Sequence, residues 1–206
     1  MQVRLIFLRH GRTQTNATAR LQGRLDSPLD DVGIMQAKRA GEGLRARFAV
    51  DRVVTSNLVR TRQTIEAAGL GGYPRGVDDR WLELDFGEYD NRLVKEVMGE
   101  LEAAWVDDIE WAPPGGESLG VLYRRVAAAC DELLASGTGE TVVVVTHANP
   151  IKAAVVWALG GGPEMMLRMR VDVASVSEIE LGAGGLLVTA FNERSHEIES
   201  TGGQLH

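Results

Sequence analysis

The chain has 206 residues, of which 44% are hydrophobic and 25% charged, a composition typical of one globular domain with a sizeable core. Its single cysteine, Cys130, excludes an intrachain disulfide framework and a multi-cysteine metal cage, and favours a reducing, cytoplasmic location. A formal net charge of −7 repels phosphate backbones, so we expect no nucleic-acid partner. No apolar run approaches the roughly 18–20 residues that span a bilayer, so we expect no membrane partner.

Short apolar runs rich in branched residues alternate with helical patterns along the chain. Runs without polar alternation are typical of strands buried on both faces, as in parallel sheets. They cover residues 3–8, 52–55 and 141–146. Apolar positions three or four residues apart predict helices over residues 31–48, 58–70, 119–134 and 151–159. This alternation predicts an α/β layered fold with right-handed crossovers.

The C-terminal third predicts a β-hairpin, in which residues 175–181 and 186–191 flank a glycine-rich turn at 182–185. The expected fold is therefore a three-layer α/β fold, with a mostly parallel mixed sheet flanked by helices. We expect a single domain over residues 1–196 and a flexible C-terminal tail over residues 197–206. Residues 90–118 are the least regular region, and we interpret them as an excursion over one face of the sheet.

Two of the four histidines directly follow predicted strands. His10 comes two residues after the first strand, and His147 comes immediately after the valine-rich one. If the two strands are parallel, both imidazoles emerge at the carboxyl edge of the sheet, where open α/β folds bind ligands. Neighbouring strands lie only about 4.8 Å apart, so the two rings could meet in one crevice.

Two arginines join this edge. Arg9 precedes His10, and Arg60 follows the strand that ends at residue 55. We expect Ser56 to cap the N-terminus of the next helix, which leaves Arg60 in the first turns of that helix. Because a guanidinium matches phosphate oxygens in a bidentate manner, these residues predict an anion pocket.

Six motifs then resemble, in the right order, those of the histidine phosphatase superfamily, also called the phosphoglycerate mutase-like family. The opening Leu-Arg-His-Gly segment leads into residues 12–16, and residues 22–29 followed by Gly33 form the second motif. The remaining four are the segments 56–64, 82–89, 114–118 and 145–147. The resemblance extends from residue 3 to about residue 160, and it implies the phosphoglycerate mutase-like fold.

The resemblance also implies a role for each matching residue. His10 would be the nucleophile, His147 its partner at the phosphoryl group, and Glu83 the proton donor and acceptor, with Asp85 and Glu88 as rival acids. Arg9 and Arg60 would bind the phosphoryl oxygens. The positions expected to line the substrate pocket are Thr13, Asn16, Gly23 and Ala148, and Gly11 would hold the His10 imidazole through its carbonyl.

The chemistry of phosphoryl transfer agrees with these roles. A neutral imidazole attacks phosphorus only if a hydrogen bond to its other nitrogen fixes the tautomer. Arg9, Arg60 and a protonated His147 would then stabilise the charge on the equatorial oxygens. This cationic pocket takes the role that a magnesium ion would have, so we expect no metal and no cofactor.

The predicted function is a metal-independent phosphomonoester hydrolase that acts on a small phosphorylated metabolite through a phosphohistidine. A cofactor-dependent phosphoglycerate mutase shares this chemistry but has to exclude water and hold a second phosphate. A non-catalytic phosphate-binding regulatory module is the alternative from another class. Edge strands of the sheet are compatible with a homodimer.

Overall fold

The structure is a computed structural model that describes residues 3–136 and 139–194. Its centre is a six-stranded sheet with the order β3-β2-β4-β1-β5-β6. Four strands run parallel: β1 (Arg4–Arg9), β2 (Arg52–Thr55), β3 (Arg75–Val77) and β4 (Thr141–Thr146). The hairpin of β5 (Val176–Gly182) and β6 (Gly185–Glu193) adds two antiparallel strands beside β1. The prediction of a mostly parallel mixed sheet is confirmed.

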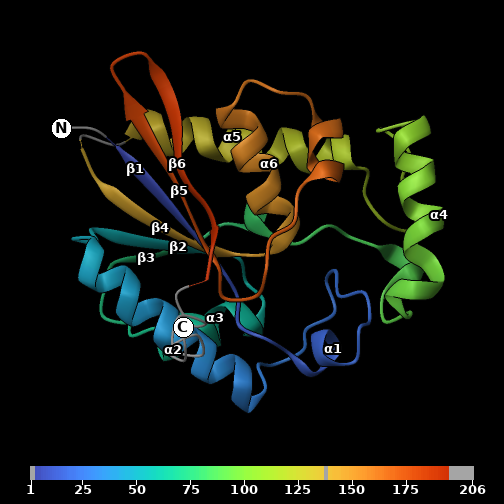
Figure 1. The fold of residues 1–206 in the computed structure, drawn as a ribbon, viewed down its shortest axis with the longest axis horizontal. Helices are drawn as coiled ribbons and strands as arrows, with labels where there is room; N and C mark the ends of the chain where they lie inside the picture. Colours follow the sequence, from blue (N-terminus) through green and yellow to red (C-terminus); the bar gives the residue numbers. More distant parts are fainter. Residues whose placement is uncertain (1–2, 137–138, 195–206) are drawn as a thin grey trace, which may run out of the picture.

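Helices cover both faces of this sheet (Figure 1). On one face lie α2 (Asp31–Arg47) and α3 (Val59–Ala67), and on the other lie α5 (Leu119–Ser136) and α6 (Ala148–Ala158). Successive strand residues point to opposite faces, so Ile6 and Leu8 pack in the α2/α3 core, whereas Leu5 and Phe7 pack in the α5/α6 core. Side chains on both faces of the sheet are buried, which explains why the strands form continuous apolar runs in the sequence.

The segment after β1 approaches α2 very closely. A Cβ on Gly11 would lie 2.2 Å from the carbonyl oxygen of Gly33, and a Cβ on Gly33 would lie 2.0 Å from that of Arg12. Glycine is therefore needed at both positions for this segment to pack so closely against α2. The turn leads into the single-turn helix α1 (Gln14–Ala17), which Thr13 caps with its side chain.

The structure differs from the sequence-based expectation at residues 90–118. This region contains α4 (Val94–Asp107), a regular helix whose buried residues Val97, Leu101 and Trp105 recur every four positions. Figure 1 shows α4 set apart from the sheet rather than lying across one face of it. Strand β3 was not expected either, and short 3₁₀ segments occur at η1 (Asp79–Trp81), η2 (Gly87–Tyr89) and η3 (Pro163–Arg168).

The expected tail, residues 197–206, lies outside the described residues. Within the described ranges, no helix combines the length and apolar character that a membrane span requires.

Candidate active site

The register of two neighbouring strands brings His10 and His147 together. Parallel pairing of β1 with β4 sets Arg9 opposite Thr146, so the histidine that follows each strand lies beside the other. The ring centroids are 5.2 Å apart and the rings meet edge to face at 60°. The expectation that the two imidazoles meet at the carboxyl edge of the sheet is confirmed.

His10 is held in a defined tautomer. Its Nδ1 lies 2.8 Å from the carbonyl oxygen of Gly11, so Nδ1 carries the proton that it donates there and Nε2 keeps a free lone pair. The side chain is only 2% exposed. Burial, followed by the charges of Arg60 and Arg9, lowers the pKa of His10 well below its usual range. The imidazole is therefore neutral at pH 7, as a nucleophile requires.

His147 is bound at both ring nitrogens. Arg60 donates from Nε to Nδ1 at 3.1 Å, which leaves the proton on Nε2 for donation to the hydroxyl of Ser56 at 2.8 Å. Burial and the Arg60 charge lower the pKa of His147 well below its usual range. His147 is therefore neutral at pH 7 in this arrangement, and its protonation during phosphoryl transfer stays a prediction.

The expected cap at Ser56 is also wrong. Helix α3 begins at Val59, and its N-cap residue, Leu58, makes no side-chain cap. The carboxylate of Asp26 accepts from the backbone N–H of Val59 instead. The Ser56 hydroxyl contacts Thr61 Oγ1 at 3.1 Å, in addition to His147. Its role is therefore to orient the imidazole, and its position directly after β2 is what brings it to this edge.

The two arginines differ in their surroundings. Arg60 is fully buried and donates to the carbonyl oxygens of Gly23 (2.7 Å) and Leu25 (2.8 Å), as well as to His147. Burial lowers its pKa to about 10, so it stays charged at pH 7. Arg9 donates to the carbonyl oxygen of Val171, while its buried Nε makes no hydrogen bond to any described residue. Arg9 thus has donor capacity left for an anion.

Glu83 is fixed against the N-terminus of α6. Its carboxylate accepts from the backbone N–H groups of Ala148 (3.1 Å) and Asn149 (3.2 Å), and from that of Leu84 (2.8 Å). The N-terminal end of a helix attracts a negative charge, so this contact anchors the side chain. Of the two rival acids, Asp85 pairs with Arg24 at 3.4 Å, and Glu88 is exposed.

A buried ion pair supports the backbone of Glu83. Arg125 on α5 binds Glu117 through two contacts of 2.8 and 2.9 Å, and both side chains are largely buried. The same guanidinium donates to the carbonyl oxygens of Arg80 and Glu83. The loop before α5 and the segment that carries Glu83 are therefore tied to one cation.

Arg9, His10 and Glu83 line a cavity of about 830 Å³ at the carboxyl edge of the sheet, whereas His147 and Arg60 are fully buried behind its lining. Its polar lining residues include Arg9, His10, Glu83 and Asn149, and Arg12, which also lines it, is held by Asp30 at 2.8 Å. The cavity also has a group of apolar lining residues. They include Val94, Met98, Trp105, Leu119, Met166 and Leu167. An anion and an apolar group attached to it can thus be accommodated together.

Of the four residues expected to bind substrate, two line the cavity and two lie behind it. Asn16 and Ala148 line the cavity. Thr13 is fully buried and donates to Gln22 at 2.6 Å, and Gly23 holds Arg60 through its carbonyl oxygen. Thr13 and Gly23 therefore support the site from behind its surface.

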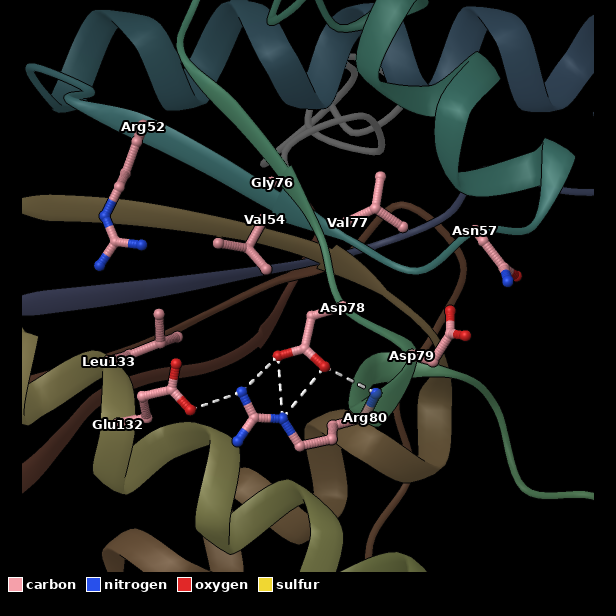
Figure 2. Close-up of a pocket in the computed structure, with 10 residues that line it drawn as sticks. All are labelled: Arg52, Val54, Asn57, Gly76, Val77, Asp78, Asp79, Arg80, Glu132 and Leu133. Carbon is pink, nitrogen blue, oxygen red and sulfur yellow. Dashed lines mark hydrogen bonds and ion pairs between the residues drawn. The ribbon is translucent and has the colours of Figure 1, made fainter.

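A second hollow, of about 670 Å³, lies next to the edge strand β3. Figure 2 shows Arg80 between Asp78 and Glu132, at 2.7 and 2.8 Å. Because this cation is already paired and no histidine lines the hollow, the cavity at His10 is the better candidate. Among residues 3–136 and 139–194, no group of three or more histidine, cysteine or acidic side chains is arranged to hold a metal ion.

Comparison with known proteins identifies the class of protein. The family model of the histidine phosphatase superfamily (branch 1) matches residues 5–194, and the chain belongs to this superfamily. It is 36% identical over 186 residues to the bifunctional protein Rv2228c of Mycobacterium tuberculosis, a match that covers 88% of this chain and 51% of the relative. The chain thus spans about half the length of that relative.

Two further similarities span more of the related proteins. The chain is 32% identical to the probable phosphoglycerate mutase GpmB of Yersinia pestis, which covers 99% of this chain and 94% of the relative. A mycobacterial glucosyl-3-phosphoglycerate phosphatase, solved with VO3, is 30% identical and superposes with a TM-score of 0.80. That superposition covers 92% of this chain and 98% of the other.

Two residues of the site were missed from the sequence. Ser56 was assigned to a helix cap, although its place at the end of a buried strand is the signal that also picked out the histidines. Lys152 lines the cavity from α6, one turn after the residues that bind Glu83. Only the helical spacing from His147 could have indicated it.

Proposed function

We propose that the protein is a phosphomonoester hydrolase that works through a phosphohistidine at His10. The observation that carries the proposal is the fixed tautomer of His10, whose unprotonated Nε2 belongs to a ring that lines the same cavity as Arg9 and Glu83. Membership of the superfamily supports it. A regulatory module with no turnover would have no need of a preset nucleophile.

In the first step, Nε2 of His10 attacks phosphorus and the bond from phosphorus to the alcohol oxygen breaks. Glu83, which has to be in its protonated form when the substrate is bound, gives its proton to the leaving oxygen. Arg9 and Arg60 stabilise the phosphoryl oxygens. Arg60 uses three of its five N–H groups within the protein and lies behind the cavity lining, so it contributes its positive charge from there. An arriving dianion favours protonation of His147, which then adds a third positive charge.

In the second step, water attacks the phosphoryl group, Glu83 takes a proton from it, and the nitrogen–phosphorus bond breaks to release inorganic phosphate. Glu83 therefore returns to its starting state after each cycle. No step needs a metal ion, because the three cationic groups supply the positive charge.

The test uses p-nitrophenyl phosphate and the His10→Asn variant, in which an amide can still donate to Gly11 but cannot accept a phosphoryl group. We expect kcat to fall by at least about 10³-fold, and acid-labile phosphate to be found on His10 only in the wild-type protein. Equal rates for the two proteins, or a rapidly quenched wild-type reaction without modified His10, would refute the proposal.

Phosphoglycerate mutase activity is the second candidate, because one relative carries that name. A mutase has to hold a second phosphate, whereas many of the side chains that line the cavity, such as Val94, Met98 and Leu167, are apolar. With 3-phosphoglycerate and a bisphosphoglycerate primer, we expect release of inorganic phosphate. Rapid formation of 2-phosphoglycerate without that release would favour the mutase instead.

A further inference from the structure

Lys152 is a cation without a partner in the cavity wall. It lines the cavity from α6, and its ammonium makes no hydrogen bond or ion pair within the part of the chain that the structure describes. The other two lysines, Lys38 and Lys95, are exposed. Burial lowers the pKa of Lys152, because desolvation disfavours its charge. An unpaired, partly desolvated cation is costly for the fold, so its presence indicates a ligand that pairs with it.

The position of Lys152 relates it to the leaving group. The backbone N–H groups of Ala148 and Asn149 bind Glu83, and Lys152 follows them by four and three residues. Residues at these spacings share one helix face about 5.4 Å apart along the axis. If Glu83 protonates the leaving oxygen, Lys152 lies one helical turn from it, on the side of the alcohol.

The surroundings of Lys152 limit the charge that it can bind. The nearby walls come from α4, α5 and η3 and carry Met98, Trp105, Leu119 and Met166. Glu83 and Glu102 both line the cavity and attract Lys152 electrostatically, Glu83 the more strongly, but neither forms an ion pair with it, and Arg9 opposes its charge. A cation that already faces two carboxylates matches a single further negative charge better than a dianion.

We infer that Lys152 binds a carboxylate of the leaving alcohol, so that the substrates are phosphate monoesters whose alcohol joins one carboxylate to an apolar or aromatic body. The inference rests on the proposed function, because it takes Glu83 to mark the leaving oxygen. The carboxylate would lie within a few bonds of the ester oxygen, and the apolar body would pack on Trp105 and the methionines. A charge-assisted hydrogen bond in this partly buried place selects for the carboxylate.

The test compares two esters that differ only in charge: 2-phosphooxy-3-phenylpropanoate and its carboxamide. For the wild-type protein we expect kcat/KM to be about 10 to 100 times higher for the carboxylate. In Lys152→Met this ratio falls to about one, whereas Lys152→Arg keeps most of it. Lys95→Met, which removes an exposed lysine from α4, is the matched control and leaves the ratio unchanged. A purely structural role of Lys152 would lower both rates together and would not move the ratio.

Several results would overturn the inference. Among them are a wild-type ratio near one, a ratio that Lys152→Met does not change, and a preference for the matching bisphosphate, 3-phenylpropane-1,2-diyl bisphosphate. A protein that cleaves p-nitrophenyl phosphate but neither test ester also contradicts it. If Lys152→Met fails to fold, the kcat/KM ratios of Lys152→Gln and of the wild-type protein still test the inference. Absence of phosphohistidine with every ester would instead refute the proposed function, so the two failures are distinguishable.

Discussion

The buried histidine pair makes the stability of the fold depend on pH. His10 and His147 are 2% and 0% exposed, and burial is the largest cause that lowers the pKa of each. Just below pH 6.5 the unfolded chain takes up protons on these rings, whereas the folded protein does not. The unfolded state then binds more protons, so the free energy of unfolding falls as the pH falls.

The size of the effect follows from the unfolded-state pKa of about 6.5. Between pH 6.5 and pH 5.5, one imidazole that stays neutral in the folded state costs RT ln(11/2), or about 1 kcal/mol. The two rings together cost about 2 kcal/mol. This figure holds as long as both folded-state pKa values lie below the window, which is the direction that burial and Arg60 impose.

Urea unfolding at pH 6.5 and pH 5.5 measures this difference. His10→Asn and His147→Asn remove one ring each, so each variant should show a pH shift smaller by about 1 kcal/mol than the wild-type shift. Contributions of carboxylates cancel in the comparison. If both variants show the full wild-type shift, the rings titrate normally in the folded protein and the assignment of a neutral nucleophile is wrong.

Three further predictions concern packing, ion pairing and the acid. Gly41→Ala should cost about 1–3 kcal/mol of unfolding free energy, because its Cβ would lie 2.2 Å from a backbone oxygen of α3's C-terminal end. Gly99→Ala, with open space around it, should gain about 0.5–1 kcal/mol in the same denaturation assay. Arg125→Met should cost about 1–3 kcal/mol, because the buried Glu117 then keeps only its 3.2 Å contact with Arg24. The exposed Arg124→Met should change the midpoint little, and equal losses would contradict the assigned burial. Glu83→Gln should lower kcat/KM, which reports formation of the phosphohistidine, by about 10²–10⁴-fold for an alkyl phosphate and much less for p-nitrophenyl phosphate, whose leaving group needs no proton. Equal losses for both substrates would count against the acid role.

Much of the sheet could be predicted from the sequence because its strands are buried on both faces. The valine run of β4 has no polar alternation, and neither does β1 between Leu5 and Leu8. Strand β3 could not be found in this way, since its three residues are all exposed and it lies at the edge of the sheet. Helix α4 did carry a periodic signal, but the surrounding prolines, glycines and acidic residues obscured it.

The site was predictable where it depends on strand ends, and less so where it depends on side-chain contacts. His10 and His147 could be paired because each directly follows a parallel strand at matching register. The contact between Ser56 and His147 joins positions 91 residues apart, so local capping rules pointed elsewhere. The neutral state of His147 likewise depends on a hydrogen bond from Arg60, which no local pattern encodes.

The place of β4 in the middle of the sheet has a consequence for folding. β4 separates β2 from β1, yet its last residue is the 146th of 206. Until that residue has been synthesised, the two earlier strands have nothing to join them, and their edges stay open to other chains. Folding therefore depends on pairings between distant parts of the chain, which slows it. Truncated or stalled chains that lack β4 should be prone to aggregate.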